Sequence, residues 1–103
     1  MENEIKIPKS FDLMGHTYKV RQVKKVDKED SCGEYISEKK VLRLKKVQKD
    51  YPQSMLEETY FHELLHAVLE ECEYTKLSAD EKFVERVGRA LHQVIKTAKY
   101  NEL

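Results

Sequence analysis

The two halves of the chain differ in how their hydrophobic and polar residues are spaced. In the first half, β-branched and aromatic residues are interleaved with Lys and Arg, most clearly over residues 17–26. This pattern, together with the flanking turn residues, predicts strands over residues 17–26, 33–37 and 40–47, and it makes residues 11–13 a candidate short strand. Met14 and Gly15 predict a turn after the first segment, and a polar run at residues 27–31 ends the second. We expect the last two segments to form a hairpin, and three antiparallel strands in all.

Apolar residues in the second half recur at helical spacing. Pro52 suits the first turn of a helix, which is predicted over residues 52–71. Ser78 and Glu81 form a capping box, which predicts a second helix over residues 78–99. The apolar stripe of the first helix is expected to be Phe61, Leu65, Val68, Leu69 and Cys72. The second helix is expected to bury Phe83, Val84, Val87, Ala90, Leu91, Val94, Ile95 and Ala98.

Length and element order predict a single α+β domain. A chain of 103 residues provides one modest hydrophobic core. Residues 1–50 are expected to be mainly β and residues 51–103 mainly α. The predicted architecture is a three-stranded antiparallel sheet packed against two long helices, in a single domain spanning residues 1–103.

Charge, apolar run length and cysteine content exclude several classes of partner. Lys and Arg total 19, as do Asp and Glu, so the net charge of zero argues against nucleic-acid binding. No apolar run approaches the roughly 20 residues that span a bilayer, and the N-terminus lacks the apolar core of a signal peptide. Cys32 and Cys72 are too few for a disulfide framework. We therefore expect a cytoplasmic protein, with no membrane partner.

The segment HELLH, residues 62–66, carries the clearest chemistry. His62 and His66 are four residues apart, so on a helix both rings project from one face and can share a metal ion. Glu63 lies beside this pair, where a carboxylate can take a proton from a metal-activated water. Zinc lowers the pKa of such a water toward neutrality. A catalytic zinc site needs a third protein ligand.

The third ligand has two candidates on the second predicted helix, Glu81 and Glu85. On a helical wheel, Glu81 lies at the margin of the apolar stripe, whereas Glu85 lies nearly opposite its centre. The position along the helix axis favours Glu85, because in a simple antiparallel pair of helices Glu85 would lie at the same level as the histidines. We expect Glu81, because hairpin helices tilt and slide, although Glu81 could serve only as the capping-box partner of Ser78.

HELLH followed by a second helix bearing DEKFVERVG resembles the gluzincin branch of the zincin metallopeptidases. In that branch a glutamate on the next helix completes the zinc site, and an acidic residue four positions further on holds a ligand histidine. The resemblance implies these two roles for Glu81 and Glu85, and Gly88 falls where several such enzymes have a small residue. The overall layout is also similar to small zincin-like proteins of phages and prophages and to minimal gluzincins. This resemblance implies that residues 1–103 form a minimal zincin-like domain.

The expected function is that of a zinc-dependent hydrolase, a metallopeptidase with Zn²⁺ at His62, His66 and Glu81 and with Glu63 as general base. Its substrate would be a peptide or protein, bound as an added strand at a sheet edge. The alternative is a non-catalytic, zinc-stabilised binding or regulatory module of phage or prophage type. His16 and His92 are interpreted as ordinary surface residues.

Overall fold

The computed structural model describes residues 4–26 and 31–101, and these residues form an α+β fold. They contain a four-stranded mixed sheet and three α-helices, two of them long. The predicted α+β class is therefore confirmed, whereas the predicted sheet of three antiparallel strands is wrong. The predicted interruption at residues 27–31 lies outside the described residues, apart from Ser31.

The sheet begins with an antiparallel hairpin. β1 (Ser10–Leu13) pairs with β2 (His16–Val23) across a tight turn. The two turn residues, Met14 and Gly15, have positive φ angles of 53° and 82°. Positive φ at both central positions is the geometry whose twist matches two paired strands. The turn predicted after the first strand segment is therefore present.

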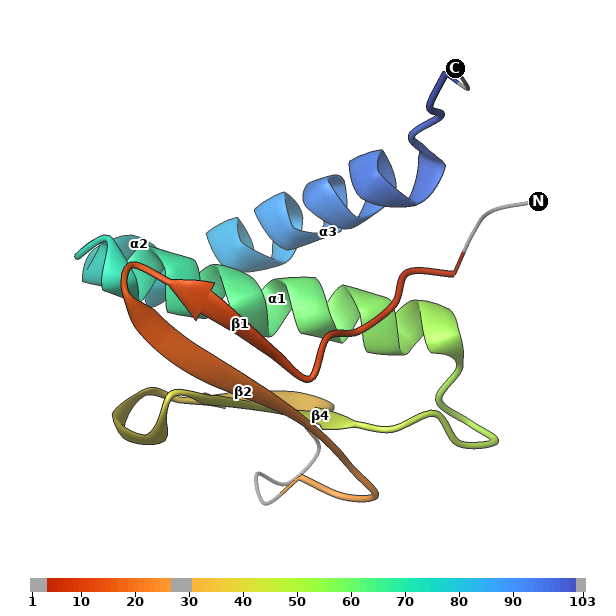
Figure 1. The fold of residues 1–103 in the computed structure, drawn as a ribbon, viewed down its shortest axis with the longest axis horizontal. Coiled ribbons are helices and arrows are strands. Elements are labelled where there is room, and N and C mark those ends of the chain that lie inside the picture. The colour runs from red at the N-terminus through yellow and green to blue at the C-terminus, as the bar shows by residue number, and fades with distance from the viewer. Residues whose placement is uncertain (1–3, 27–30, 102–103) are drawn as a thin grey trace.

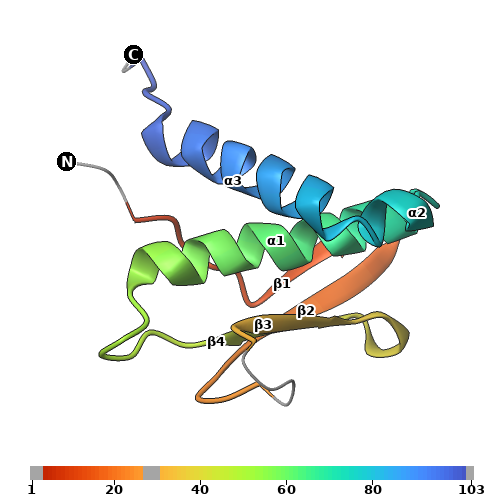
Figure 2. The ribbon, with the colours of Figure 1, turned by 180° about the vertical axis from the view of Figure 1, so that it is seen from behind.

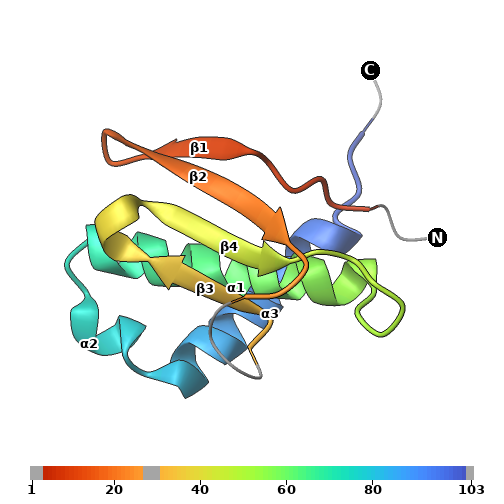
Figure 3. The same ribbon diagram turned by 90° about the horizontal axis from the view of Figure 1, so that it is seen from below.

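The second pair of strands explains the error in the predicted sheet. β3 (Gly33–Ile36) and β4 (Val41–Lys45) are antiparallel, joined by the 3₁₀ turn η1 (Ser37–Lys39), so the predicted hairpin is present. β4 also pairs with β2, but in parallel, which gives the strand order β1-β2-β4-β3. This order places Leu42 and Leu44, both fully buried, on a central strand. β3 becomes an edge strand on the side of α2 and α3 (Figure 3).

The helices are α1 (Gln53–Glu71), the short α2 (Thr75–Ser78) and α3 (Glu81–Thr97). Figures 1 and 2 show α1 lying between the sheet and α3. The main core, between the sheet and α1, consists of Tyr18, Val20, Leu42, Leu44, Tyr51, Leu56, Tyr60, Phe61 and Ala67. A smaller core between the two long helices consists of Leu65, Leu69 and Val84. α1 is therefore buried on two sides rather than along a single stripe, and the predicted core residue Cys72 is exposed.

The start of α3 differs from the predicted capping box. The N-cap is Asp80, whose carboxylate accepts a hydrogen bond from the Phe83 backbone N–H at 3.1 Å. Ser78 instead ends α2, and its side chain points into the protein. Because Asp80 satisfies the free N–H group of the helix terminus, the side chains of Ser78 and Glu81 are available for other contacts.

The C-terminal half of α3 is more exposed than predicted. Ala90, Leu91, Val94 and Ile95 are all exposed, with Val94 at 63%. Figures 1 and 2 show α3 moving away from α1 toward its C-terminal end. The apolar periodicity of this segment therefore correctly predicts a helix, but the divergence of the two helices leaves its outer apolar face in solvent.

A buried carboxylate anchors the N-terminal part of α1. Glu57 has no exposed surface, and its Oε1 atom lies 2.8 Å from Lys96 Nζ and 2.9 Å from His92 Nε2. Its Oε2 atom accepts hydrogen bonds from the Ile5 backbone N–H and the Gln53 amide. Glu57 thus joins the N-terminal segment, α1 and α3. The interpretation of His92 as a surface residue is wrong, since its side chain is 13% exposed and packed on this network.

A second carboxylate anchors the opposite end of α1. Glu71 Oε2 accepts a hydrogen bond from the buried Tyr18 hydroxyl and lies 2.7 Å from His16 Nδ1 and 3.3 Å from Lys40 Nζ. The hydrogen bonds from Tyr18 and then His16 lower the pKa of Glu71 to about 2. Glu71 thus ties the end of α1 to β2 and to the residue that follows η1. The HELLH residues lie between the two anchored ends of α1.

Candidate metal centre

The middle of α1 presents two histidines and a glutamate toward α3 and the β3 edge. His62 and His66 are one helical turn apart, and their ring centroids are 5.0 Å from each other. Their side chains are 24% and 14% exposed. Glu63 is more deeply placed, at 8% exposure, under the β3 edge. The helical spacing therefore produces the side-by-side histidine pair expected from the sequence.

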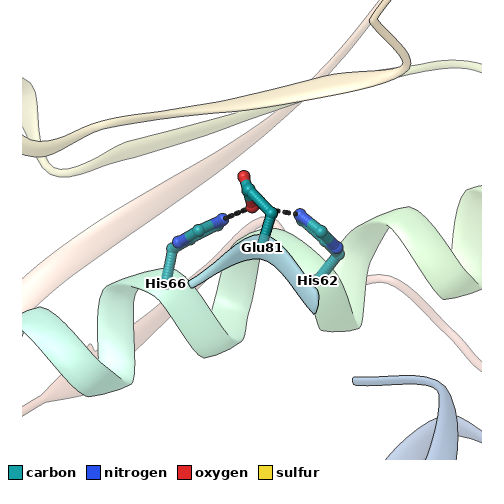
Figure 4. A group of neighbouring side chains, drawn as sticks. All are labelled: His62, His66 and Glu81. Carbon is teal, nitrogen blue, oxygen red and sulfur yellow. Dashed lines mark hydrogen bonds and ion pairs between the residues drawn. The ribbon is translucent and has the colours of Figure 1, made fainter. Parts of the chain in front are cut away.

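Glu81, the first residue of α3, completes a three-residue cluster with the histidine pair (Figure 4). Its Oε1 atom lies 3.0 Å from His66 Nε2 and 3.4 Å from His62 Nε2. One possible ligand atom from each residue lies within 4.8 Å of the other two. The two imidazoles and the carboxylate therefore converge on one point, although they come from two different helices.

The spacing of these atoms can be compared with the bond lengths of a zinc ion. Zinc binds histidine nitrogen and carboxylate oxygen at about 2.0–2.2 Å in tetrahedral geometry, which places neighbouring ligand atoms about 3.4 Å apart. Glu81 Oε1 lies 3.0 Å and 3.4 Å from the two Nε2 atoms. The cluster could therefore hold one metal ion.

Glu85, the other predicted candidate, lies on the opposite side of His62. Its Oε2 atom is 3.4 Å from His62 Nδ1, while its Oε1 atom is 3.8 Å from Arg89. The structure thus brings Glu81, rather than Glu85, to the Nε2 atoms. Glu85 occupies the position of a carboxylate that orients a ligand histidine through its other nitrogen.

His66 has a corresponding contact, which sequence reasoning missed. The Ser78 hydroxyl lies 3.0 Å from His66 Nδ1 and donates a hydrogen bond to Glu70 Oε2 at 2.9 Å. The sequence interpretation assigned Ser78 to the helix cap. Asp80, two positions later, is also a favoured N-cap residue. Its residue type could have indicated that Asp80 caps the helix and that Ser78 has a different role.

Two adjoining clefts of about 360 and 290 Å³ flank the histidine pair. Ser31, Gly33, His62 and Glu63 line both of them. The larger cleft extends along β3 past Tyr35 toward Glu81. Volumes near 300 Å³ are at the low end for small-molecule sites. Glu63 therefore lies, together with His62, on the wall that the two clefts share.

Gly33 allows the β3 edge to approach α1 closely enough to form these clefts. A Cβ atom at this position would lie 2.5 Å from Thr59 Cγ2 and 3.2 Å from Glu63 Cγ. We expect Gly33→Ala to lower the free energy of unfolding by about 1–3 kcal/mol, because the strand and helix must separate. Urea denaturation measures this loss.

Gly88→Ala is the matched control for Gly33→Ala. At Gly88 the nearest atoms to an added Cβ lie 3.5 Å away, at ordinary contact distance. Alanine also favours a helix interior over glycine by about 1 kcal/mol. Gly88→Ala should therefore leave stability unchanged or raise it. Equal stability of Gly33→Ala and the wild type would contradict the close packing of β3 on α1.

Searches of known protein families, of curated proteins and of solved structures found nothing that matches this chain. Within residues 4–26 and 31–101, no helix combines the length and apolar character needed to cross a membrane. Functional arguments for this protein therefore depend on the geometry of its own residues.

Proposed function

We propose that this protein is a zinc-dependent peptide hydrolase that binds one Zn²⁺ ion through His62, His66 and Glu81. The observation that carries the proposal is the convergence of these three side chains, because one possible ligand atom of each lies within 4.8 Å of the other two. Two histidines and one glutamate are a donor set typical of catalytic zinc, which keeps its fourth position open. The resemblance of HELLH to gluzincins supports the same assignment.

The contacts of the other ring nitrogens support metal binding at Nε2. His62 Nδ1 faces Glu85, and His66 Nδ1 faces Ser78. Ligand histidines in proteins commonly use one nitrogen for the metal and the other for a carboxylate, carbonyl or similar partner. Both rings are therefore oriented from behind, with their Nε2 atoms directed toward Glu81.

Glu63 supplies the acid–base chemistry in this proposal. Zinc bound at the site would acidify water and polarise the carbonyl of the scissile bond. The Glu63 carboxylate would accept a proton from the attacking water and pass it to the leaving amine. Its burial beside His62, at the wall shared by both clefts, supports this role.

The β3 edge supports a peptide or protein substrate. Among the described strands, β3 pairs with β4 alone, and Gly33, Glu34 and Tyr35 from β3 line the larger cleft. An extended peptide could pair with this edge through main-chain hydrogen bonds. Such pairing would carry the peptide past Glu63 and the histidine pair.

Metal analysis tests the binding part of the proposal. Protein purified without chelator should retain about one zinc ion per chain, and His62→Ala should lose it. His16→Ala is the matched control, because His16 bonds to Glu71 and not to the cluster. Zinc at 100 times its dissociation constant should also raise the free energy of unfolding by about 2.7 kcal/mol. A protein that binds no zinc, or that retains iron instead, would contradict the assignment.

Cleavage of a peptide library tests the catalytic part. We expect cleavage by the zinc-loaded protein, its loss on chelation, and its return when zinc is restored. The cleavage products, identified by mass spectrometry, would also define the residues preferred on each side of the scissile bond. Zinc binding without cleavage across broad libraries would refute hydrolysis of peptides.

The second candidate function is a zinc-stabilised binding module without catalysis. The observation that favours it is that the three donors come from both α1 and α3, so a metal ion would link two helices that diverge toward the other end. In that case zinc would raise stability and partner affinity, and Glu63 would be dispensable. The response of the protein to substitution of Glu63 separates the two functions.

A further inference from the structure

The larger of the two clefts beside the histidine pair is lined by acidic side chains. Among its described lining residues there are four glutamates and no lysine or arginine. The four glutamates are Glu34, Glu63, Glu70 and Glu81. A cleft lined by charges of one sign strengthens the field that acts on a bound ligand. The charge of this cleft therefore affects which substrates it can hold.

Glu70 differs from the other three carboxylates in its contacts. Glu34 Oε1 lies 2.9 Å from Arg43, and Glu81 contacts the histidine pair. Within residues 4–26 and 31–101, Glu70 forms no ion pair, and its carboxylate accepts one hydrogen bond, from the Ser78 hydroxyl to Oε2 at 2.9 Å. No buried side-chain oxygen in this part of the chain lacks a hydrogen-bond partner, so Oε1 of the half-buried Glu70 is accessible to solvent. Glu70 can therefore accept further hydrogen bonds from a ligand in the cleft.

The charges that line the cleft balance except at Glu70. A bound Zn²⁺ ion would bring two positive charges, which the carboxylates of Glu63 and Glu81 together offset. The ion pair with Arg43 offsets the charge of Glu34. The remaining formal charge among the described lining residues is that of Glu70. Because a partly buried charge is costly unless it is paired, a ligand that supplies a cation at this position is favoured.

Glu70 lies on the same face of α1 as the histidine pair, one helical turn beyond His66. At a rise of about 1.5 Å per residue, it is about 9 Å along the helix axis from the level midway between the two histidines. An extended peptide advances about 3.3 Å per residue, so this distance corresponds to about three residues of a bound peptide. A peptide held along the cleft would therefore have a side chain close to Glu70 on one side of the scissile bond.

We propose that Glu70 selects peptide substrates that carry a lysine or arginine within about three residues of the scissile bond, on the side that occupies the larger cleft. This inference rests on the proposed function, because it names the substrate class of the same site. The cationic head group would donate charge-assisted hydrogen bonds to Glu70. Its methylene stem would lie along the cleft wall, as the stems of long basic side chains commonly do.

Paired peptides test this selection. Otherwise uncharged peptides carry one lysine, or norleucine as its uncharged counterpart, at each position in turn. At a position on one side of the scissile bond, the zinc-loaded protein should prefer lysine by about 10- to 100-fold in kcat/KM, the effect of a hydrogen bond to a charged group. Because both peptides are measured on the same zinc-loaded protein, a change in zinc affinity cancels from this ratio.

Three variants show whether Glu70 is the source of the preference. Glu70→Gln keeps an oxygen that can accept from Ser78 but removes the charge, and it should abolish the preference for lysine. Glu70→Lys should reverse it, so that a peptide with glutamate at the same position is preferred to norleucine. Glu73→Gln is the matched control, because Glu73 is exposed and lines neither cleft. It should keep the preference of the wild type.

Peptide binding provides a second readout that needs no turnover. Fluorescence anisotropy on zinc-loaded Glu63→Gln protein should show the same preference for lysine, and adding Glu70→Gln should remove it. Equal affinities and rates for the paired peptides, or a preference that survives Glu70→Gln, would overturn the inference. If the protein binds no zinc or cleaves no peptide, the proposed function fails. Binding of the paired peptides to the metal-free protein, with and without Glu70→Gln, then decides by itself whether Glu70 selects cationic side chains.

Discussion

Replacing Glu63 by glutamine should leave zinc bound and lower kcat/KM for peptide hydrolysis by about 100- to 10,000-fold, the range contributed by a general acid–base group. Glutamine has nearly the same shape, so the packing of residue 63 against Gly33 is preserved. The amide cannot take a proton from water, and the rate should fall without loss of the metal. Zinc content and kcat/KM, measured on a peptide selected from the library, check the two halves of this prediction.

Glu58→Gln is the matched control for this experiment. Glu58 is also a carboxylate on α1 and lines the smaller cleft, but it is 41% exposed and pairs with Arg89 rather than the cluster. Its replacement should leave both zinc content and rate close to those of the wild type. Full activity in Glu63→Gln would show that Glu63 is not the base. Equal inactivity of the wild type and Glu63→Gln would favour the non-catalytic module.

The part of the site that lies on a single helix was predictable from the sequence. His62 and His66 meet because residues four apart share a helix face, which depends only on local geometry. The approach of Glu81 depends on the placement of α3, and therefore on the turn made by α2. The helical wheel favoured Glu81, whereas the position along the helix axis favoured Glu85. The two arguments disagreed because neither takes account of the tilt of one helix against the other. Ser78 was misassigned for a related reason, because its sequence pattern also fits a capping box.

The errors in the predicted sheet also concern contacts between residues that are far apart in the sequence. Residue composition located β2, β3 and β4 and marked the position of β1 as a candidate strand, because β-branched and aromatic residues mark strands locally. It did not reveal that β4 inserts between β2 and β3, because strand partners are set by the burial of residues such as Leu42 and Leu44 against α1. The same limitation applies to Gly33, which looks like an ordinary strand-start residue until its contact with Thr59 is known.

α1 must be held rigidly if the histidine pair is to meet Glu81, and two carboxylates provide this. Glu57 fixes its N-terminal part to α3, and Glu71 fixes its C-terminal end to the sheet. Binding geometry is most precise on elements whose own positions are fixed by surrounding packing and hydrogen bonds. Of the two, Glu57 is fully buried and contacts α3, the helix that carries Glu81. Its loss should therefore have the larger effect on stability and on the site.

Glu57→Ala should lower the free energy of unfolding by about 3–5 kcal/mol, the range observed when one partner of a buried ion pair is removed. The variant leaves Lys96 and His92, each 13% exposed, without their carboxylate. This loss is a large part of the roughly 5–15 kcal/mol that stabilises a typical domain. Urea denaturation measures it, with Glu58→Ala as control. Glu58 forms an ion pair with the exposed Arg89, and such surface pairs contribute at most about 1 kcal/mol.

The effect of Glu57→Ala should also depend on pH. Burial by itself would raise the pKa of Glu57, but hydrogen bonds from Lys96 and His92 outweigh burial and lower the pKa from 4.5 to about 2. Because the folded pKa is below the unfolded value, the stabilisation is complete above about 4.5 and is lost as the pH falls toward 2. A shift of this size corresponds to about 3 kcal/mol at neutral pH. The stability difference between wild type and Glu57→Ala should therefore narrow over this acidic range, and a difference that stays constant would show that the ionised carboxylate is not the source of the stabilisation.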